Sequence, residues 1–500
     1  MISRLSGAAA GAILVVAAAA AQAPSNGLNP QVKEVVDSIS EDRIGATLTK
    51  LQSFGTRYVM SAQDDPAHGI GAAKRWIHDQ FASYSPRLQV SYQTFHIKKG
   101  ARRGQVLHEV ELANVIAVLP GTVDKDRFVI VSGHYDTVNL HYKPPFNDQE
   151  RMADLIKRGM VESEAKRYIQ LFPTDEARPE VDNEATAAET ISPGVTDDGS
   201  GTATVLELAR VMSKYQFHKS LVFIAFAGEE IGLEGSKVYA ESAEAQNMQI
   251  EAVLNNDIVG SIMAGDGRTS NSSLRVFAGG PEDSPARALL RYTKLIAERY
   301  VPSMRVDMIF HQDRFNRGGD QLSFFTKGYA AVRLTTPAEN YQNQHTATDT
   351  LDNTSPPYVA RVAKMNCAVA ASIALAPAPP VVNYTILSGE RKGDRLPMLS
   401  RGKSEYDAVM RWQPAAAASS NGDVSNLAGY AIVMRSTTAP DWQREIWVGN
   451  TTTYVLKDFS IDDVVLGVKA VDRDGNQSLV SAYLEPVRQE LVAPPARPTK

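Results

Sequence analysis

The sequence predicts an α/β fold in which helices sandwich a mixed twisted sheet, followed by a small C-terminal β-sandwich. Short, continuously apolar runs at 128–132, 221–227 and 252–254 have the composition of strands that are buried on both faces. Segments with helical spacing of apolar residues lie before and after these runs. Beyond residue 376 the chain changes to short alternating segments divided by turn residues, which is typical of an all-β domain.

The first 23 residues are typical of a secretory signal peptide. They contain the basic Arg4, an apolar run at 8–21 and small residues near Ala23 that suit signal peptidase. A retained membrane anchor is the alternative, but the Ala-rich run is short and weakly apolar for a span. We therefore expect a secreted or periplasmic protein without stable membrane insertion after cleavage.

Composition narrows the possible partners. The 500 residues include 43% hydrophobic residues, enough for a sizeable core and about two to three domains. A formal net charge of -5 provides no basic field to attract nucleic acid, so we expect no nucleic-acid partner. Cys367 is the only cysteine, which excludes an intrachain disulfide, and its apolar helical surroundings favour a buried, inert thiol.

The region 24–376 contains the expected helices and strands of the α/β domain. Helical patterns are expected at 32–54, 69–84, 202–215, 285–300 (starting after Ser284) and 357–376, and further strands at 90–96, 110–119 and 330–334. Between two of the polar turns, residues 139–193 form a long polar insertion with helical patterns. It is either a lid over a pocket or a surface excursion without a role.

A second, smaller domain is expected after the Pro-rich linker 377–382. Residues 383–490 resemble a fibronectin type III β-sandwich, and 491–500 form a tail. Trp412, Tyr430 and Tyr454 are expected as core aromatics, with carbohydrate contact as the alternative. This domain is a candidate for contact with a cell surface or with another protein.

Polar residues follow each of the three apolar runs. Ligands of open α/β sheets bind beyond the carboxyl ends of the strands, so these positions are favoured for function. Another acidic turn precedes the helix at 202–215, and a histidine lies in the segment 344–350. The candidate site residues are His134, Asp136, Asp197, Glu229, Glu230, Asp257 and His345.

Each candidate alone also fits an ordinary capped turn or charged loop, but together they fit a metal centre. Carboxylates mixed with imidazoles, without a thiolate, suit zinc, manganese or cobalt at a catalytic site better than structural zinc. One carboxylate can bridge two ions, which together activate a water and polarise a carbonyl.

Five motifs in order resemble the secreted di-zinc aminopeptidase family that includes the Streptomyces and Vibrio leucyl-type aminopeptidases. The motifs are GHYD at 133–136, DDGSG at 197–201, AGEE at 227–230, NND at 255–257 and QHTATDT at 344–350. The resemblance covers about residues 31–376 and implies a zinc exopeptidase domain with the phosphorylase/hydrolase-like fold.

The resemblance also implies roles for the candidate residues. Five would bind two Zn²⁺ ions: His134 and Asp257 one ion, Glu230 and His345 the other, and Asp197 both. Glu229 would be the general base, and Asp136 would orient His134. Two positions depart from the family. Gln344 stands where Tyr is common, and Gly319-Asp320-Gln321 replaces Ser-Asp-His, so that the role of Asp320 is open.

The leading hypothesis is a secreted aminopeptidase that hydrolyses N-terminal residues from peptides through a water activated by two metals. A carboxypeptidase of the same fold is one alternative, with Arg314, Arg317 or Arg333 binding the terminal carboxylate. A glutaminyl cyclase-like enzyme with one zinc and an inactive exported binding protein are the others. The complete ligand set and Glu229 favour the aminopeptidase.

Overall fold

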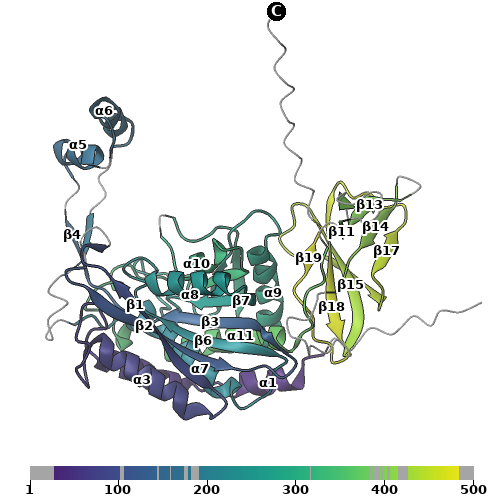
Figure 1. Ribbon diagram of the computed structural model, residues 1–500, viewed down its shortest axis with the longest axis horizontal. Helices are drawn as coiled ribbons and strands as arrows, with labels where there is room; N and C mark the ends of the chain where they lie inside the picture. Colours follow the sequence, from purple (N-terminus) through teal and green to yellow (C-terminus); the bar gives the residue numbers. More distant parts are fainter. Residues whose placement is uncertain are drawn as a thin grey trace, which may run out of the picture.

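The computed structural model contains an α/β domain beside a β-sandwich (Figure 1). It describes residues 27–101, 106–143, 146–157, 159–173, 178–181, 191–315, 317–382, 385–386, 395–396, 398–402, 406–414 and 426–483. The predicted signal peptide and the predicted tail lie outside the described residues.

An eight-stranded mixed sheet forms the centre of the larger domain, with the order β1-β2-β6-β3-β7-β10-β8-β9. Its strands are β1 (Gln89–Ile97), β2 (Val110–Leu119), β3 (Asp124–His134), β6 (Lys219–Phe226), β7 (Gln249–Asn256), β8 (Ser273–Phe277), β9 (Arg305–Ile309) and β10 (Ala331–Thr335). The four adjacent strands β6, β3, β7 and β10 are parallel to one another, whereas β1 with β2, β2 with β6, and β10 with β8 are antiparallel. This confirms the predicted mixed sheet.

Helices cover both faces of the sheet (Figure 1). They are α1 (Pro30–Asp37), α2 (Glu41–Ser53), α3 (Gly69–Tyr84), α7 (Ser200–Met212), α8 (Glu234–Ala245), α9 (Pro285–Tyr300), α10 (Gln321–Phe325) and α11 (Pro356–Leu375). Successive side chains of a strand point to opposite faces. Along β6, Phe223 therefore packs in the core with α7 and α11, while Ile224 packs in the core with α8 and α10. The continuous apolar run at 221–227 thus has partners on both faces.

The first predicted helix is wrong in its length. Residues 32–54 form two helices, because the chain breaks between Ser38 and Ser40. The Ser40 side chain accepts a hydrogen bond from the backbone N–H of Arg43 and caps α2. The predicted start of α9 is confirmed, since Ser284 caps it by accepting from Arg287 N–H.

α11 is the one helix among the described residues that is long and apolar enough to cross a membrane. Most of it is buried inside the protein, as in the core helix of a water-soluble domain. Cys367 lies on this helix and is fully buried, and burial raises the pKa of its thiol.

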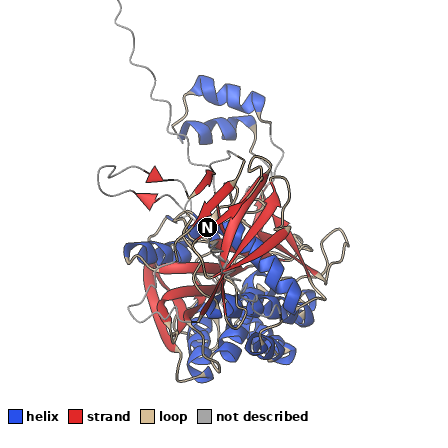
Figure 2. Cartoon of the chain, turned by 90° about the vertical axis from the view of Figure 1, so that its right-hand side faces the viewer, coloured by secondary structure: helices blue, strands red, loops and turns tan. Residues whose placement is uncertain are grey.

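The insertion forms a helical hairpin that stands away from the domain (Figures 1 and 2). Its helices are α5 (Asp148–Lys157) and α6 (Glu162–Leu171), and its base is an antiparallel ribbon of β4 (Leu140–Lys143) and β5 (Arg178–Val181). The ribbon begins beside the candidate site, because Leu140 N–H donates to the His345 carbonyl at 2.9 Å. The predicted helical character is confirmed, and a lid role stays a prediction.

The C-terminal region has two antiparallel sheets. One contains β13 (Leu399–Arg401), β14 (Ala408–Arg411) and β17 (Thr453–Leu456); the other contains β16 (Arg444–Gly449), β15 (Leu427–Ser436), β18 (Val464–Asp472) and β19 (Ser481–Ala482). A separate ribbon pairs β11 (Thr385–Ile386) with β12 (Arg395–Leu396). Trp412 and Tyr430 are buried in edge-to-face contact at 5.5 Å, whereas Tyr454 is half-buried at the border of this core.

The sandwich packs against α9 of the larger domain (Figure 1). Arg435 of β15 is buried and donates to Glu282 at 2.8 Å and to Asp283 at 2.7 Å. In the other direction, Arg291 of α9 donates to the carbonyl of Pro440 at 2.7 Å and to Asp283 at 2.8 Å. Two buried guanidinium groups thus join the two domains.

Candidate active site

The predicted site residues meet at the carboxyl edge of four adjacent parallel strands. His134 ends β3, Glu229 and Glu230 lie in the turn after β6, and Asp257 follows β7. Asp136 lies just after β3, and the other two residues come from connections: Asp197 from the turn Val195–Gly199 before α7, where the Asp197–Asp198 peptide bond is cis, and His345 from the loop after β10.

Asp197 lies between the two histidines. Its Oδ1 is 3.3 Å from His134 Nε2, and its Oδ2 is 3.0 Å from His345 Nε2. Each carboxylate oxygen therefore faces a different imidazole. This arrangement suits a carboxylate that is shared between two ligand groups.

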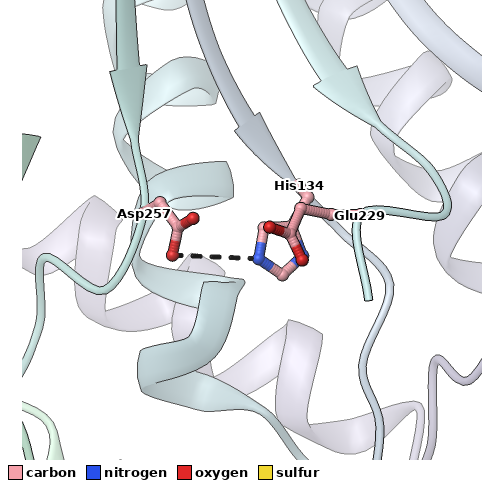
Figure 3. A group of neighbouring side chains, drawn as sticks. All are labelled: His134, Glu229 and Asp257. Atoms are coloured by element: carbon pink, nitrogen blue, oxygen red, sulfur yellow. Dashed lines mark ion pairs between the residues drawn. The ribbon is translucent and has the colours of Figure 1, made fainter. Parts of the chain in front are cut away.

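The remaining carboxylates divide between the same two histidines. Asp257 Oδ1 is 4.0 Å from His134 Nε2, and Figure 3 shows these two side chains facing each other beside Glu229. Glu230 Oε1 is 3.2 Å from His345 Nε2. Ligand atoms of His134, Glu229 and Asp257 all lie within 4.8 Å of one another, as do those of His134, Asp197 and Glu230.

Two buried ligand atoms lack a hydrogen-bond partner among the described residues: His134 Nε2 and Glu230 Oε1. Buried polar atoms are nearly always satisfied, so this pair calls for an additional partner. Imidazole nitrogen and carboxylate oxygen, without thiolate, are the donors of catalytic zinc sites. The residues therefore fit zinc on the chemistry of their own atoms.

The pKa shifts of the carboxyl groups in the site also favour the binding of cations. Burial raises the pKa of Glu229 well above its usual range, and the neighbouring charges of Glu230 and Asp257 raise it further. Burial opposes ionisation of Asp197, but contacts with His134 and His345 hold its pKa well below the usual range. Cations at this position would compensate the crowded carboxylates.

Asp136 contacts both the histidine and the glutamates. Its backbone carbonyl is 3.1 Å from His134 Nδ1, and its carboxylate Oδ1 is 3.6 Å from the same nitrogen. The carboxylate also accepts the backbone N–H groups of Glu229 and Glu230, each at 3.2 Å. Asp136 is fully buried and thus fixes the turn of both glutamates as well as the imidazole ring.

Sequence reasoning missed two carboxylates that hold the ligand-bearing segments together. Asp198 accepts the backbone N–H groups of His134, Gly201 and Ile258, and so ties β3 to α7 and to the turn after β7. Asp349 accepts the N–H groups of Thr196 and Asp197, each at 2.9 Å. Asp198 lies within the motif DDGSG and Asp349 within QHTATDT. Their membership of these motifs is the one sequence feature that could have indicated a role.

Arg57 and Arg333 were also not recognised as supports. Arg57 is buried and donates to the carbonyls of Tyr135, Pro193 and Gly194. Arg333 is completely buried and lies 2.7 Å from Asp257 Oδ1. Its burial and this ion pair make it unsuitable for binding the terminal carboxylate of a substrate.

A cavity of about 630 Å³ opens over the candidate ligands. Its wall also carries Leu140, Leu233, Lys237, Arg314, Arg317, Tyr341 and Gln344. Asp320, by contrast, is buried and does not line this cavity; burial raises its pKa to about 7. Asp320 is therefore not among the described residues that face the cavity.

Comparison with known proteins gives a consistent family. Residues 114–370 match the model described as peptidase family M28. A protein of Pyricularia oryzae named "Probable zinc metalloprotease" is 32% identical over 492 residues, covering 92% of this chain and 84% of that protein. One of the same name from Pyrenophora teres f. teres is 32% identical over 484 residues, covering 90% and 86%.

Solved structures show lower similarity. The LapA aminopeptidase of Legionella pneumophila is 19% identical, with a TM-score of 0.47, over 71% of this chain and 77% of that one. The fungal relatives, in contrast, match the chain over nine-tenths of its length, which includes the C-terminal region.

Proposed function

Because the chain belongs to peptidase family M28 and is a zinc metallopeptidase, we propose that it is an aminopeptidase that uses two zinc ions to hydrolyse the N-terminal residue from peptides. The position of Asp197 carries this proposal. A carboxylate whose two oxygens face two separate imidazoles is suited to bridge a pair of ions.

In this proposal His134 and Asp257 would hold one zinc ion, Glu230 and His345 would hold the other, and Asp197 would serve both. When bound, zinc supplies Lewis acidity: it polarises the scissile carbonyl and lowers the pKa of a water molecule. Asp136 keeps the His134 ring in place through Nδ1, so that Nε2 points into the site.

Glu229 is the proposed general base. It borders the cavity beside His134 and Asp257 but is not needed as a ligand in this assignment. Burial raises its pKa, which suits a carboxylate that takes a proton from water and later gives it to the leaving amine. Its backbone N–H bond to Asp136 fixes the turn from which it reaches the site.

The complete set of ligand candidates argues against a cyclase with a single zinc. For a carboxypeptidase, Arg317 is the relevant residue among the three arginines considered, because Arg333 is buried and Arg314 is paired with Glu339 at 2.6 Å. Because neither Arg314 nor Arg333 is available to bind a terminal carboxylate, the aminopeptidase is the first choice.

The test uses a short unblocked peptide and its N-acetylated and C-amidated forms, with and without a chelator. We expect chelator-sensitive release of the first amino acid that requires the free amine and tolerates the amide. A requirement for the free carboxylate would make the protein a carboxypeptidase. No cleavage of any form by protein carrying two zinc ions per chain would refute peptidase activity and favour a cyclase or a binding protein.

We also propose that residues 1–23 direct export, so that the enzyme acts in the periplasm or outside the cell. The C-terminal sandwich, proposed as fibronectin type III-like over 383–490, is a candidate for contact with a cell surface or another protein. Mass spectrometry of the N-terminus after expression would test the first point. A chain beginning at Met1 would contradict it.

A further inference from the structure

One part of the cavity wall has a charge that the proposed hydrolysis does not use. The wall carries four carboxylates, those of Asp197, Glu229, Glu230 and Asp257, and the same cavity is lined by the cationic Lys237, Arg314 and Arg317. Bound zinc would neutralise much of the negative charge of the carboxylates. The cationic side chains would still attract an anionic group of a ligand. Their local contacts decide which of them is available to a ligand.

Arg314 already has anionic partners. It lies 2.6 Å from Glu339 Oε2 and 3.3 Å from Asp313 Oδ1, and its side chain is only 8% exposed. Glu339 also pairs with Arg275. The carboxylate of Glu339 is therefore already paired with two guanidinium groups, those of Arg314 and Arg275.

Arg317 is the third arginine, and it makes no close ion pair among the described residues, although the charges of Asp197 and Glu339 raise the pKa of its guanidinium against burial. Its Nη1 is 3.9 Å from Glu339 and donates to the neutral carbonyl oxygen of Gln344 at 3.2 Å. Among the described residues this is the one hydrogen bond that its guanidinium makes. Its side chain is 30% exposed, so part of the donor fork faces the cavity.

Arg317 is nevertheless held in place. The Gln344 amide donates to Glu339 at 3.4 Å, which directs its carbonyl oxygen to Arg317. The guanidinium also lies over the Tyr341 ring, 5.6 Å from its centroid. An oriented planar fork with unused donors is the group that binds carboxylates most selectively.

Lys237 adds a second positive charge on the cavity wall. It extends from α8, is half exposed, and has a contact of 3.5 Å with Glu234 one turn earlier. Such an exposed pair is weak. The ammonium group can therefore strengthen the positive field near Arg317 without forming a fixed contact.

We propose that Arg317, assisted by Lys237, forms a subsite for a substrate carboxylate, so that the enzyme prefers peptides with a carboxylate close to the scissile bond. This rests on the proposed peptidase function. The carboxylate comes either from the acidic side chain of the N-terminal residue or from the free C-terminus of a dipeptide.

Kinetics of the zinc-loaded enzyme test the subsite. The p-nitroanilides of glutamate and glutamine report a side-chain carboxylate, and Leu-Gly with its amide reports a terminal one. We expect kcat/KM to favour the carboxylate in at least one pair by roughly 10- to 100-fold. The preference should nearly vanish in Arg317→Gln and be partly kept in Arg317→Lys.

Arg268→Gln is the matched control, because Arg268 is an exposed surface arginine with its own acidic partner. It should keep the wild-type preference. Zinc content and thermal unfolding of each variant exclude misfolding as the cause. A wild-type enzyme that prefers neither carboxylate, or an Arg317→Gln variant that keeps the preference, would overturn the proposal.

Calorimetric binding to chelator-treated protein separates this proposal from the catalytic one. L-glutamate and Gly-Gly should bind more tightly than L-glutamine and Gly-Gly amide in at least one pair, and Arg317→Gln should remove the difference. If no peptide is cleaved but this difference is present, the peptidase function fails and the subsite stands. If peptides are cleaved and no difference exists in binding or kinetics, the subsite fails alone.

Discussion

Replacing Glu229 with glutamine would separate catalysis from metal binding. The change keeps the size of the side chain and the backbone N–H bond to Asp136 but removes the proton acceptor. General bases contribute about 10²- to 10⁴-fold to rate. At about 1.36 kcal/mol for each factor of ten, the barrier should rise by roughly 3 to 5 kcal/mol.

The adjacent residue gives the contrasting variant. Glu230 Oε1 is 3.2 Å from His345 Nε2, so Glu230→Gln should lower zinc content as well as rate. Glu241→Gln, on the exposed face of α8, is the control for the loss of one charge. Peptide hydrolysis gives kcat, and elemental analysis gives zinc per chain. If Glu229→Gln loses zinc, or keeps both zinc and wild-type kcat, the assignment of the base is wrong.

Three further variants test the supports of the site and of the fold. Asp136→Asn should lower zinc affinity by about 10- to 100-fold, measured by competition with a chelating dye, and unchanged affinity would contradict its positioning role. Arg435→Met removes the partner of Asp283 across the domains but leaves its contact with Arg291, so it should cost about 2 kcal/mol in urea denaturation, whereas wild-type stability would refute a coupling role. Burial opposes the ionisation of Glu339, but Arg314 and its neighbours lower its pKa below 4.5, so its contribution to stability is full above that pH and is lost as pH falls. The destabilisation by Glu339→Gln should thus be largest near neutral pH and shrink as the pH of the denaturation experiment falls through the acidic range, and a constant difference would count against the ion pair.

The approximate position of the site was predictable because its residues follow buried strands. A run such as 221–227 has no polar face, which indicates a central strand, and the carboxyl ends of parallel strands meet at one edge. The structure places β6, β3 and β7 side by side, so the turns after these strands converge. The same argument could not find Asp198 or Asp349, because their partners are backbone N–H groups of distant segments, which a single sequence does not reveal.

Other errors have equally local causes. Helical periodicity continues through the break at Ser38 to Ser40 because Ile39 is buried like a helix residue, although Ser40 caps the second helix. In the sandwich, β15 and β18 belong to the alternating apolar segments that predict an all-β domain. The strand β16 gives no such signal, since its side chains are half-buried or exposed along its whole length and show little contrast between faces.

The order of the strands also sets when the metal centre can form. His134 and His345 are separated by most of the larger domain in the chain, yet only β7 lies between β3 and β10 in the sheet. A nascent chain cannot present the full ligand set until the loop after β10 has emerged and β10 has paired with β7. Until then the acidic groups at the strand ends repel one another. Zinc binding would therefore be a late step of folding, because it requires a completed sheet.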